Sequence, residues 1–133
     1  MSKILITGVR SCTGVHLTRF LDSIGEGPIV GSGTSSSVSC DSGLSRYIPC
    51  DFQNGADVAR LLEIANPQIV FHLAGSSDEG DPEALIKTNI QGTWHLLDVC
   101  QRQRVRPSAI LLVGSAAGYG PVSDARDSLR EAR

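Results

Sequence analysis

The residues best suited to chemistry begin near the N-terminus, where glycines and small polar residues follow a short apolar run. The run ends at Thr7-Gly8, a loop of small residues follows, and Gly14 leads into an amphipathic segment. A strand, a tight glycine turn and a helix start in this order direct backbone N–H groups and the positive end of the helix at a phosphate. When a second strand follows, the pattern is typical of a dinucleotide-binding fingerprint.

Small or polar residues also follow each of the later apolar runs. Because the carboxyl ends of parallel strands meet at one edge of a sheet, residues in these positions line a common crevice. Each group alone is compatible with ordinary turn chemistry, but their repetition after every expected strand favours a ligand site. The groups are Thr7 to Thr13, Ser32 to Thr34, Asp51-Phe52, Ala74 to Ser76, and Gly114-Ser115.

The elements that must position these groups are apolar runs alternating with amphipathic segments. Strands are expected at residues 3–7, 28–32, 46–51, 68–74 and 109–115, and helices at 14–24, 57–65 and 82–104. This alternation predicts a parallel sheet with right-handed crossovers. The expected fold is α/β, a Rossmann-type doubly wound sheet with strand order 3-2-1-4-5 that stops before a sixth strand. Residues 1–120 are expected to form this dinucleotide-binding domain, and residues 121–133 a loop or an unfinished element.

The longest predicted helix begins with Asp81-Pro82, a cap followed by a first-turn proline. Asn89 and Thr93 on this helix are expected to tie it to neighbouring strand ends. His72 lies within an apolar strand, where a hydrogen-bonded core histidine is the expected state. Trp94 is expected in the core or in an interface. The apolar stripe predicted for the helix consists of Leu85, Ile86, Ile90, Trp94, Leu97 and Cys100.

Composition and charge argue against several classes of function. The 133 residues carry a formal net charge of −2 with a pI near 5.8, so the chain has no electrostatic attraction to nucleic acid or to an anionic membrane. The sequence contains no apolar run long enough to span a bilayer and no signal-peptide pattern, and a cytoplasmic location is expected. The four cysteines and three histidines lack metal-ligand spacing, so no metal site is expected.

The glycine turn and four later blocks, in the same order and spacing, resemble the extended short-chain dehydrogenase/reductase family, which contains sugar-nucleotide epimerases and dehydratases. The turn is similar to the family's TGxxGxxG loop, with Ser11 in place of the middle glycine. The resemblance covers almost the whole chain and corresponds to the amino-terminal Rossmann part of the family. The segment from Leu111 to Gly120 looks most like GDP-mannose dehydratases and GDP-deoxyhexose reductases. The later blocks are Asp51-Phe52, Pro67 to Gly75, Thr88 to Thr93, and Val113 to Gly120.

This resemblance implies a role for each group of strand-end residues. The backbone of the turn would hold the pyrophosphate, and Asp51 would accept a hydrogen bond from the adenine amino group beside Phe52. Ser115, the implied catalytic residue, would bind the substrate group that undergoes hydride transfer. The residues from Leu73 to Gly75 would line the ribose and the nicotinamide. The implied cofactor-binding residues are Thr7, Gly8, Arg10, Ser11, Cys12, Thr13, Ser32, Thr34, Asp51, Phe52, Leu73, Ala74 and Gly75.

The residues after the second expected strand favour NADP over NAD. An NAD site usually places a carboxylate on the ribose hydroxyls at this point, and residues 30–40 contain no acid. Ser32 and Thr34 would not repel a 2′-phosphate, and Arg10 lies where NADP-using relatives often keep a basic residue. We therefore expect NADP as the preferred cofactor, with NAD as the alternative.

The sequence departs from the family pattern at two points. The Ser11 side chain would crowd the pyrophosphate or require an unfavourable backbone angle, although its hydroxyl could instead donate to a phosphate. The family's Tyr-x-x-x-Lys acid/base pair is absent, because the chain has only Tyr47 and Tyr119 and neither has a lysine at that spacing. General acid/base chemistry is therefore not expected of this chain alone.

The sequence thus predicts the NAD(P)-binding portion of a sugar-nucleotide epimerase, dehydratase or reductase, inactive as this truncated chain. The alternative is a non-catalytic NAD(P)-binding sensor or interaction module. A nucleotide sugar is the substrate implied for a longer parent protein. The uncovered fifth strand and the helix carrying Trp94 predict self-association, since unprotected strand edges recruit other chains.

Overall fold

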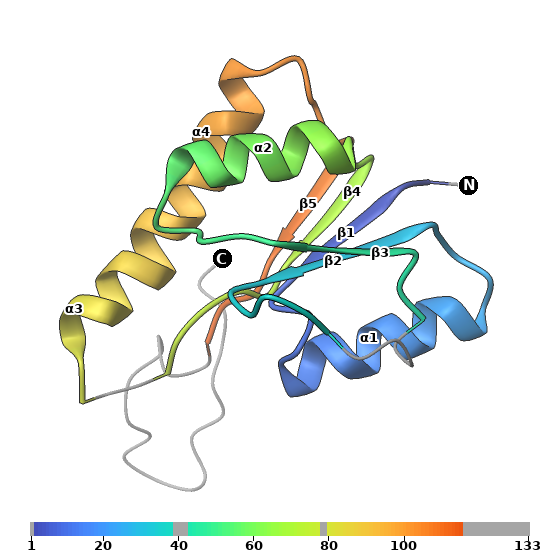
Figure 1. Cartoon of the computed structure of the whole chain (residues 1–133), viewed down its shortest axis with the longest axis horizontal. Helices are drawn as coiled ribbons and strands as arrows, with labels where there is room; N and C mark the ends of the chain where they lie inside the picture. Colours follow the sequence, from blue (N-terminus) through green and yellow to red (C-terminus); the bar gives the residue numbers. More distant parts are fainter. Residues whose placement is uncertain (1, 39–42, 78–79, 116–133) are drawn as a thin grey trace, which may run out of the picture.

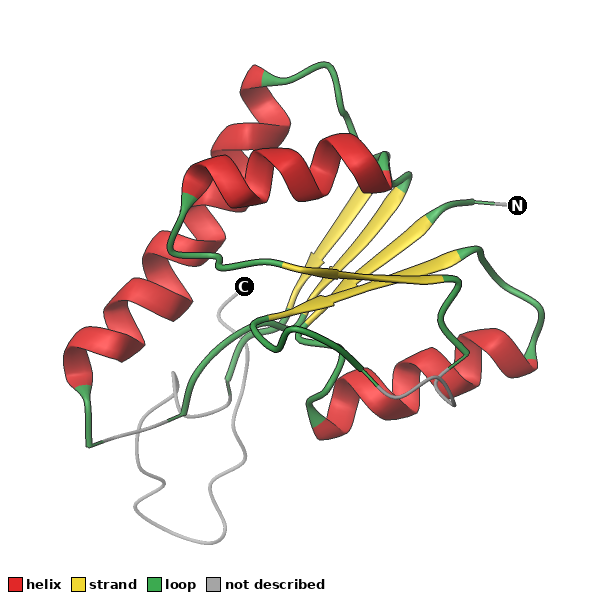
Figure 2. Ribbon diagram, viewed as in Figure 1, coloured by secondary structure: helices red, strands yellow, loops and turns green. Residues whose placement is uncertain are grey.

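The computed structural model describes residues 2–38, 43–77 and 80–115, and its framework is a five-stranded sheet (Figure 1, Figure 2). All strand pairs are parallel and the order is β3-β2-β1-β4-β5, which confirms the predicted topology. The segment predicted at 121–133 lies outside the described residues, as do Tyr119 and Gly120. The strands are β1 (Ile4–Thr7), β2 (Ile29–Gly33), β3 (Arg46–Pro49), β4 (Ile69–His72) and β5 (Ala109–Leu112).

The central position of β1 follows from its sequence. All four of its residues are buried, as expected of a strand that helices cover on both faces of a parallel sheet. Its last residue, Thr7, pairs in register with Ser32 of β2 and with His72 of β4. The three strands therefore reach the same level, and the residues that follow them meet at one edge of the sheet.

Helices cover both faces of this sheet (Figure 1). α1 (Cys12–Ser23) packs on one face, where Leu21 joins a cluster with Ile4, Ile6 and Ile29. α2 (Gly55–Ala65) and α4 (Gly92–Arg102) lie together on the opposite face. The larger core cluster lies between these two helices and the sheet, and it includes Leu5, Val58, Leu61, Leu62, Val70 and Leu96.

The predicted long helix has three parts rather than one. It consists of α3 (Pro82–Leu85), a π-helical segment η1 (Ile86–Gln91) and then α4. The start is as predicted, because the Asp81 carboxylate accepts from the Ala84 N–H at 3.0 Å and Pro82 occupies the first turn. A π turn holds more residues than an α turn, so η1 changes which side chains face the sheet after it.

The predicted apolar stripe of this helix is wrong. α4 buries Leu96, Val99 and Cys100 in the core cluster. Apolar residues occur at three- and four-residue spacing on two sides of the helix, and the side that meets α2 is the one that is buried. Of the predicted stripe only Cys100 is buried, whereas the exposed fractions of Ile86, Ile90, Trp94 and Leu97 are 52%, 64%, 56% and 40%.

Candidate dinucleotide-binding site

Two close backbone approaches shape the turn between β1 and α1. Gly8 has a φ of +65°, and a Cβ atom there would lie 2.7 Å from backbone atoms of Leu73 and Ala74. A Cβ atom on Gly14 would lie 2.6 Å from the carbonyl oxygen of Gly8. Glycine at position 8 lets the turn contact the end of β4, and glycine at position 14 lets α1 approach the turn.

Ser11 caps α1 without straining the turn. Its backbone is extended, with φ −64° and ψ 160°, so the unfavourable backbone angle predicted for it is wrong. The Ser11 hydroxyl accepts from the Gly14 N–H at 3.0 Å, which starts the helix at Cys12 instead of the predicted Gly14. The first amides of the helix therefore belong to Cys12 and Thr13, and both residues are exposed.

A cavity of about 360 Å³ opens beside this turn, at the carboxyl edge of the sheet. Its walls come from the residues that follow β1, β2, β3 and β4, together with one residue of η1. The predicted topology places a ligand crevice at this edge, at the carboxyl ends of the first and fourth strands, which are β1 and β4. The implied cofactor-binding residues that line the cavity are Gly8, Arg10, Ser11, Thr34, Asp51, Phe52, Leu73, Ala74 and Gly75.

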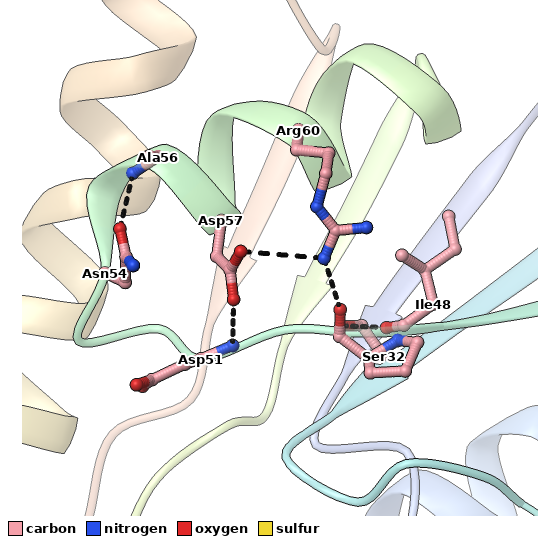
Figure 3. Close-up of polar contacts among 8 residues, drawn as sticks. Ser32, Ile48, Asp51, Asn54, Ala56, Asp57 and Arg60 are labelled. Atoms are coloured by element: carbon pink, nitrogen blue, oxygen red, sulfur yellow. Dashed lines mark hydrogen bonds and ion pairs between the residues drawn. The ribbon is translucent and has the colours of Figure 1, made fainter.

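The other implied site residues lie outside the lining of this cavity. Ser32 is fully buried, and its hydroxyl donates to the Ile48 carbonyl at 2.8 Å (Figure 3). Thr7 is also buried, while Cys12 and Thr13 are exposed on the first turn of α1. The implied catalytic Ser115 is exposed, beyond the end of β5.

Four further residues line the cavity that were not among the implied cofactor-binding residues: Gly33, which belongs to the strand-end group Ser32 to Thr34, and Ser35, Gln53 and Thr88. The first three lie next to residues that were assigned, so their positions in the strand-end loops were the available signal. Thr88 belongs to the block from Thr88 to Thr93, one of those that carry the family resemblance, in which only Asn89 and Thr93 were predicted to have a role, as structural ties. Its place in the cavity depends on how η1 packs, which no local pattern predicts.

The start of α2 holds Asp51 at the cavity wall (Figure 3). Asp57 accepts from the Asp51 N–H at 3.3 Å, and the Asp51 carboxylate accepts from the Gln53 N–H at 2.9 Å. The neighbouring Phe52 is almost fully buried, with its ring 5.5 Å from the His72 ring, centroid to centroid. An acceptor beside a fixed aromatic residue suits the amino group and flat ring of a nucleobase.

A cation and two hydroxyl groups meet in the loop after β2. The Arg10 guanidinium donates to the Ser35 hydroxyl, and the Tyr47 phenol donates to the Ser35 carbonyl at 2.8 Å. Burial is the largest influence on Tyr47 and raises its pKa, so the phenol keeps its proton at neutral pH. Arg10 and Asp51 are the only charged side chains among the described residues that line the cavity.

Thr7 and Asn89 hold the residues that follow β4. The Thr7 hydroxyl accepts from the N–H groups of Leu73 and Ala74, each at 3.1 Å. The Asn89 side chain accepts from the Ser76 N–H at 2.7 Å and donates to the Ser76 carbonyl at 2.9 Å. These contacts confirm the predicted tie between the long helix and a strand end.

His72 is a buried, hydrogen-bonded histidine, as predicted. Its Nδ1 atom lies 2.8 Å from the Thr7 hydroxyl, and its Nε2 atom lies 3.1 Å from the Thr93 hydroxyl. Burial lowers the pKa of His72 to about 4, so the ring is neutral at physiological pH. The cavity wall thus rests on an uncharged polar network.

The described part of the chain offers binding groups but no metal centre. Within residues 2–38, 43–77 and 80–115, no group of three or more His, Cys, Asp or Glu side chains is arranged to hold a metal ion. In that same part of the chain, no helix combines the length and apolar character needed to cross a bilayer. The cavity presents backbone amides, hydroxyls and one charge of each sign, which suits a polar ligand with phosphates and a base.

A parallel sheet in this order, with a glycine turn after β1 and a cavity at the carboxyl edge, defines a Rossmann-type nucleotide-binding domain. The sequence profile of the NAD dependent epimerase/dehydratase family matches residues 4–132, and the chain belongs to this family. The match confirms the resemblance to the extended short-chain dehydrogenases/reductases.

Individual relatives agree with this assignment. A dTDP-glucose 4,6-dehydratase from Salmonella typhimurium is 32% identical over an alignment of 112 residues, and the match covers 75% of this chain and 31% of the dehydratase. The human short-chain dehydrogenase/reductase family 42E member 1 is 32% identical over 106 residues, 77% of this chain and 27% of that protein. The crystal structure of UDP-glucose 4-epimerase from Brucella ovis in complex with NAD matches with a TM-score of 0.78 and 25% identity, over 94% of this chain and 39% of the epimerase. The chain thus spans well under half the length of each of these proteins.

Proposed function

We propose that the chain binds a nicotinamide dinucleotide and forms the cofactor-binding portion of an enzyme that acts on sugar nucleotides. The observation that carries the proposal is the cavity, because residues following four parallel strands line it beside a glycine turn that opens a helix. At Gly8 and Gly14 a Cβ atom would lie within 2.6–2.7 Å of backbone atoms, so these glycines let the turn, the end of β4 and the start of α1 come together beside the cavity. The family is NAD dependent by description, and the solved Brucella ovis relative is an NAD complex.

Each part of the cofactor has a corresponding group in this proposal. The pyrophosphate lies against the turn from Gly8 to Thr13, the adenine beside Asp51 and Phe52, and the nicotinamide half along Leu73 to Gly75. The bound cofactor would supply hydride transfer at a sugar carbon. Ser115 is proposed to hold the substrate group at which that transfer occurs, and the nucleotide sugar stays unspecified, with the likeness to GDP-mannose dehydratases a prediction.

Calorimetric titration of the purified chain with NADPH and NADH tests the proposal. Ala74→Phe places a large ring at the cavity edge and is expected to weaken binding about tenfold or more, equivalent to at least ~1.4 kcal/mol. Phe20→Ala is the matched control, because Phe20 is exposed on α1 and does not line the cavity. A folded wild-type chain that binds neither dinucleotide would contradict the proposal.

We also propose that NADP(H) is preferred over NAD(H). Support comes from Arg10, which donates to Ser35 in the loop after β2, where Thr34 adds a second hydroxyl to the cavity. Residues 30–40 contain no carboxylate that would repel a 2′-phosphate. The sequence also predicted Ser32 beside this phosphate, but its buried hydroxyl donates to the Ile48 carbonyl, so Ser32 is not part of the proposal.

Arg10→Ala is expected to weaken NADPH binding about tenfold, since a charge-assisted hydrogen bond to phosphate contributes roughly 1.5–3 kcal/mol. NADH binding should change less than twofold. Arg19→Ala is the control, because Arg19 is exposed on α1 and lies outside the cavity lining. Equal or tighter binding of NADH by the wild type would contradict the preference.

A non-catalytic NAD(P)-binding sensor or interaction module is the second candidate. It is favoured if the reading frame ends after Arg133, because proton transfer at the sugar needs a Tyr-x-x-x-Lys pair and the 133 residues contain none. The coding sequence after Arg133 distinguishes the two. An in-frame Tyr-x-x-x-Lys there supports the enzyme portion, which alone binds cofactor without turnover, and a stop codon supports the binding module.

Self-association belongs to this proposal as well. The apolar face of η1 and α4 that carries Ile86, Ile90, Trp94 and Leu97 is exposed, and β5 lies at the edge of the sheet that the described residues form, with Leu111 and Leu112 exposed. A second copy of the chain would cover apolar surface at either place.

A further inference from the structure

An unbroken series of hydrogen bonds joins the cofactor cavity to the long helix through His72. It starts at the N–H groups of Leu73 and Ala74, which line the cavity, and passes to the Thr7 hydroxyl at 3.1 Å from each. From Thr7 it continues to His72 Nδ1 at 2.8 Å and from His72 Nε2 to the Thr93 hydroxyl at 3.1 Å. It ends at the Asn89 carbonyl of η1, to which the Thr93 hydroxyl donates at 2.7 Å.

The Thr7 end of the series fixes one proton of the ring. A hydroxyl oxygen has two acceptor sites and one proton. The Thr7 hydroxyl accepts from the amides of Leu73 and Ala74, the first of which also reaches the Thr7 carbonyl at 3.2 Å, so the hydroxyl proton points to His72. His72 Nδ1 must therefore be an acceptor without a proton.

The Thr93 end gives the same answer independently. The Thr93 hydroxyl donates to the Asn89 carbonyl at 2.7 Å, so toward His72 it can only accept. His72 Nε2 must then carry the proton. Both ends of the series select the neutral ring protonated on Nε2, and burial, which lowers the pKa of His72 to about 4, keeps the ring in that state.

We propose that His72, as the neutral ring protonated on Nε2, is a positioning residue that orients the Thr7 hydroxyl and so holds the Leu73–Ala74 wall in its cofactor-binding conformation. This rests on the proposed function, because it assigns a role within the same site. A proton on Nδ1 would present three donors to the two acceptor sites of Thr7 and leave the Thr7 proton without an acceptor. The Ala74 amide would then lose its partner and the wall would shift there, whereas the Leu73 N–H would keep the Thr7 carbonyl at 3.2 Å.

Two substitutions separate the roles of the two ring nitrogens of His72. His72→Asn places an amide oxygen near the position of Nδ1 and keeps an acceptor for Thr7, whereas His72→Gln reaches the position of Nε2 and leaves Thr7 without one. Both replace the same buried ring with an amide side chain, so both should lower the unfolding temperature, and affinity is compared between chains that are folded at the temperature of the titration. We expect His72→Asn to bind NADPH within about threefold of wild type and His72→Gln to bind at least tenfold more weakly.

Equal affinity losses in the two variants, in proportion to their loss of stability, would overturn the positioning role and leave His72 a packing residue. A failure of the folded wild type to bind either dinucleotide would instead contradict the proposed function. The two failures are therefore distinguishable by the same titrations.

A measurement without cofactor completes the test. Long-range ¹⁵N–¹H spectra of the wild-type chain at neutral pH should show the His72 ring with a protonated Nε2 and an unprotonated Nδ1. Hydrogen exchange of the Ala74 amide should accelerate in His72→Gln and stay near the wild-type rate in His72→Asn. A ring protonated on Nδ1, or equal acceleration in both variants, would overturn the proposal whatever the cofactor does.

Discussion

At the scale of single residues, the two ends of α1 need glycine for different reasons, space at Gly14 and backbone conformation at Gly25. Gly14 has a helical conformation, but its neighbours are backbone atoms of Gly8 and Val9 that a Cβ atom would meet at 2.6–2.7 Å. Gly25, which ends the α1 region, has a φ of +74° with no atom within 4 Å of a Cβ position. The two glycines therefore test different physical requirements.

Gly14→Ala is expected to cost about 3 kcal/mol of unfolding free energy and to abolish cofactor binding, because α1 must move away from the turn. Gly25→Ala should cost only about 1 kcal/mol, since the left-handed conformation alone is strained. Urea denaturation gives both values. A Gly14→Ala chain as stable as Gly25→Ala would show that α1 does not pack on the turn as described.

Acid should destabilise the chain through His72. The pKa of His72 is about 4 in the folded chain and near 6.5 in a flexible chain. Between these values the unfolded chain binds a proton that the folded chain does not. The contribution of the neutral His72 ring to the unfolding free energy is therefore fully present above pH 6.5. It is lost as the pH falls toward 4, by roughly 3 kcal/mol in total.

Urea unfolding at several pH values between 7 and 4, for wild type and His72→Asn, measures this contribution. The difference in unfolding free energy between the two proteins should shrink as the pH falls. A difference that stays constant across that range would show that His72 titrates normally in the folded chain.

At the scale of elements, η1 is where the long helix meets the cavity. Asn89 makes two hydrogen bonds to the backbone of Ser76, and Thr88 lines the cavity beside it. A π-helical segment at such a place is common, because the wider turn redirects side chains toward a site.

Asn89→Ala is expected to lower the unfolding free energy by about 1–2 kcal/mol, since two hydrogen bonds at a partly solvated site are lost. Hydrogen exchange of the Ser76 amide should also accelerate. Gln91→Ala, at an exposed position of the same segment, is the control and should change neither value. An unchanged Ser76 exchange rate in Asn89→Ala would contradict the role of this tie.

The same elements define how far the sequence could predict the structure. β1, β2 and β4 are apolar runs buried between helix layers, and that pattern suffices for the strands and their order. The buried face of α4 could not be predicted, because Leu96 and Leu97 are both apolar and only contact with α2 selects the first. The site residues after each strand followed from topology, but the burial of Ser32 depends on the carbonyl of Ile48, a partner in another strand.

At the scale of the whole molecule, exposed apolar side chains of the described residues gather along β5, η1 and α4. Relatives are more than twice as long as the part that this chain matches. Surface of this kind, carried by a chain with low net charge, favours association.

Sedimentation velocity at increasing concentration should therefore show dimers or larger species. Ile90→Asp tests the helix face and Leu111→Asp tests the β5 surface, and the substitution that restores a monomer locates the contact. Both positions are exposed, so neither change should lower the unfolding free energy by more than about 0.5 kcal/mol. A wild-type chain that remains monomeric throughout would contradict self-association.

The pairing of β1 with β4 has a consequence for the order of events during synthesis. Thr7 and His72 are 65 residues apart in the chain, yet they meet at the cavity wall. At a ribosomal rate of about 5–20 residues per second, β1 emerges roughly 3–13 seconds before its partner. During that interval β1 has only β2 beside it, and its open edge can pair with strands of other nascent chains. The cofactor cavity is therefore a late product of translation, since its lining needs the residues after β4 and then Thr88 of η1.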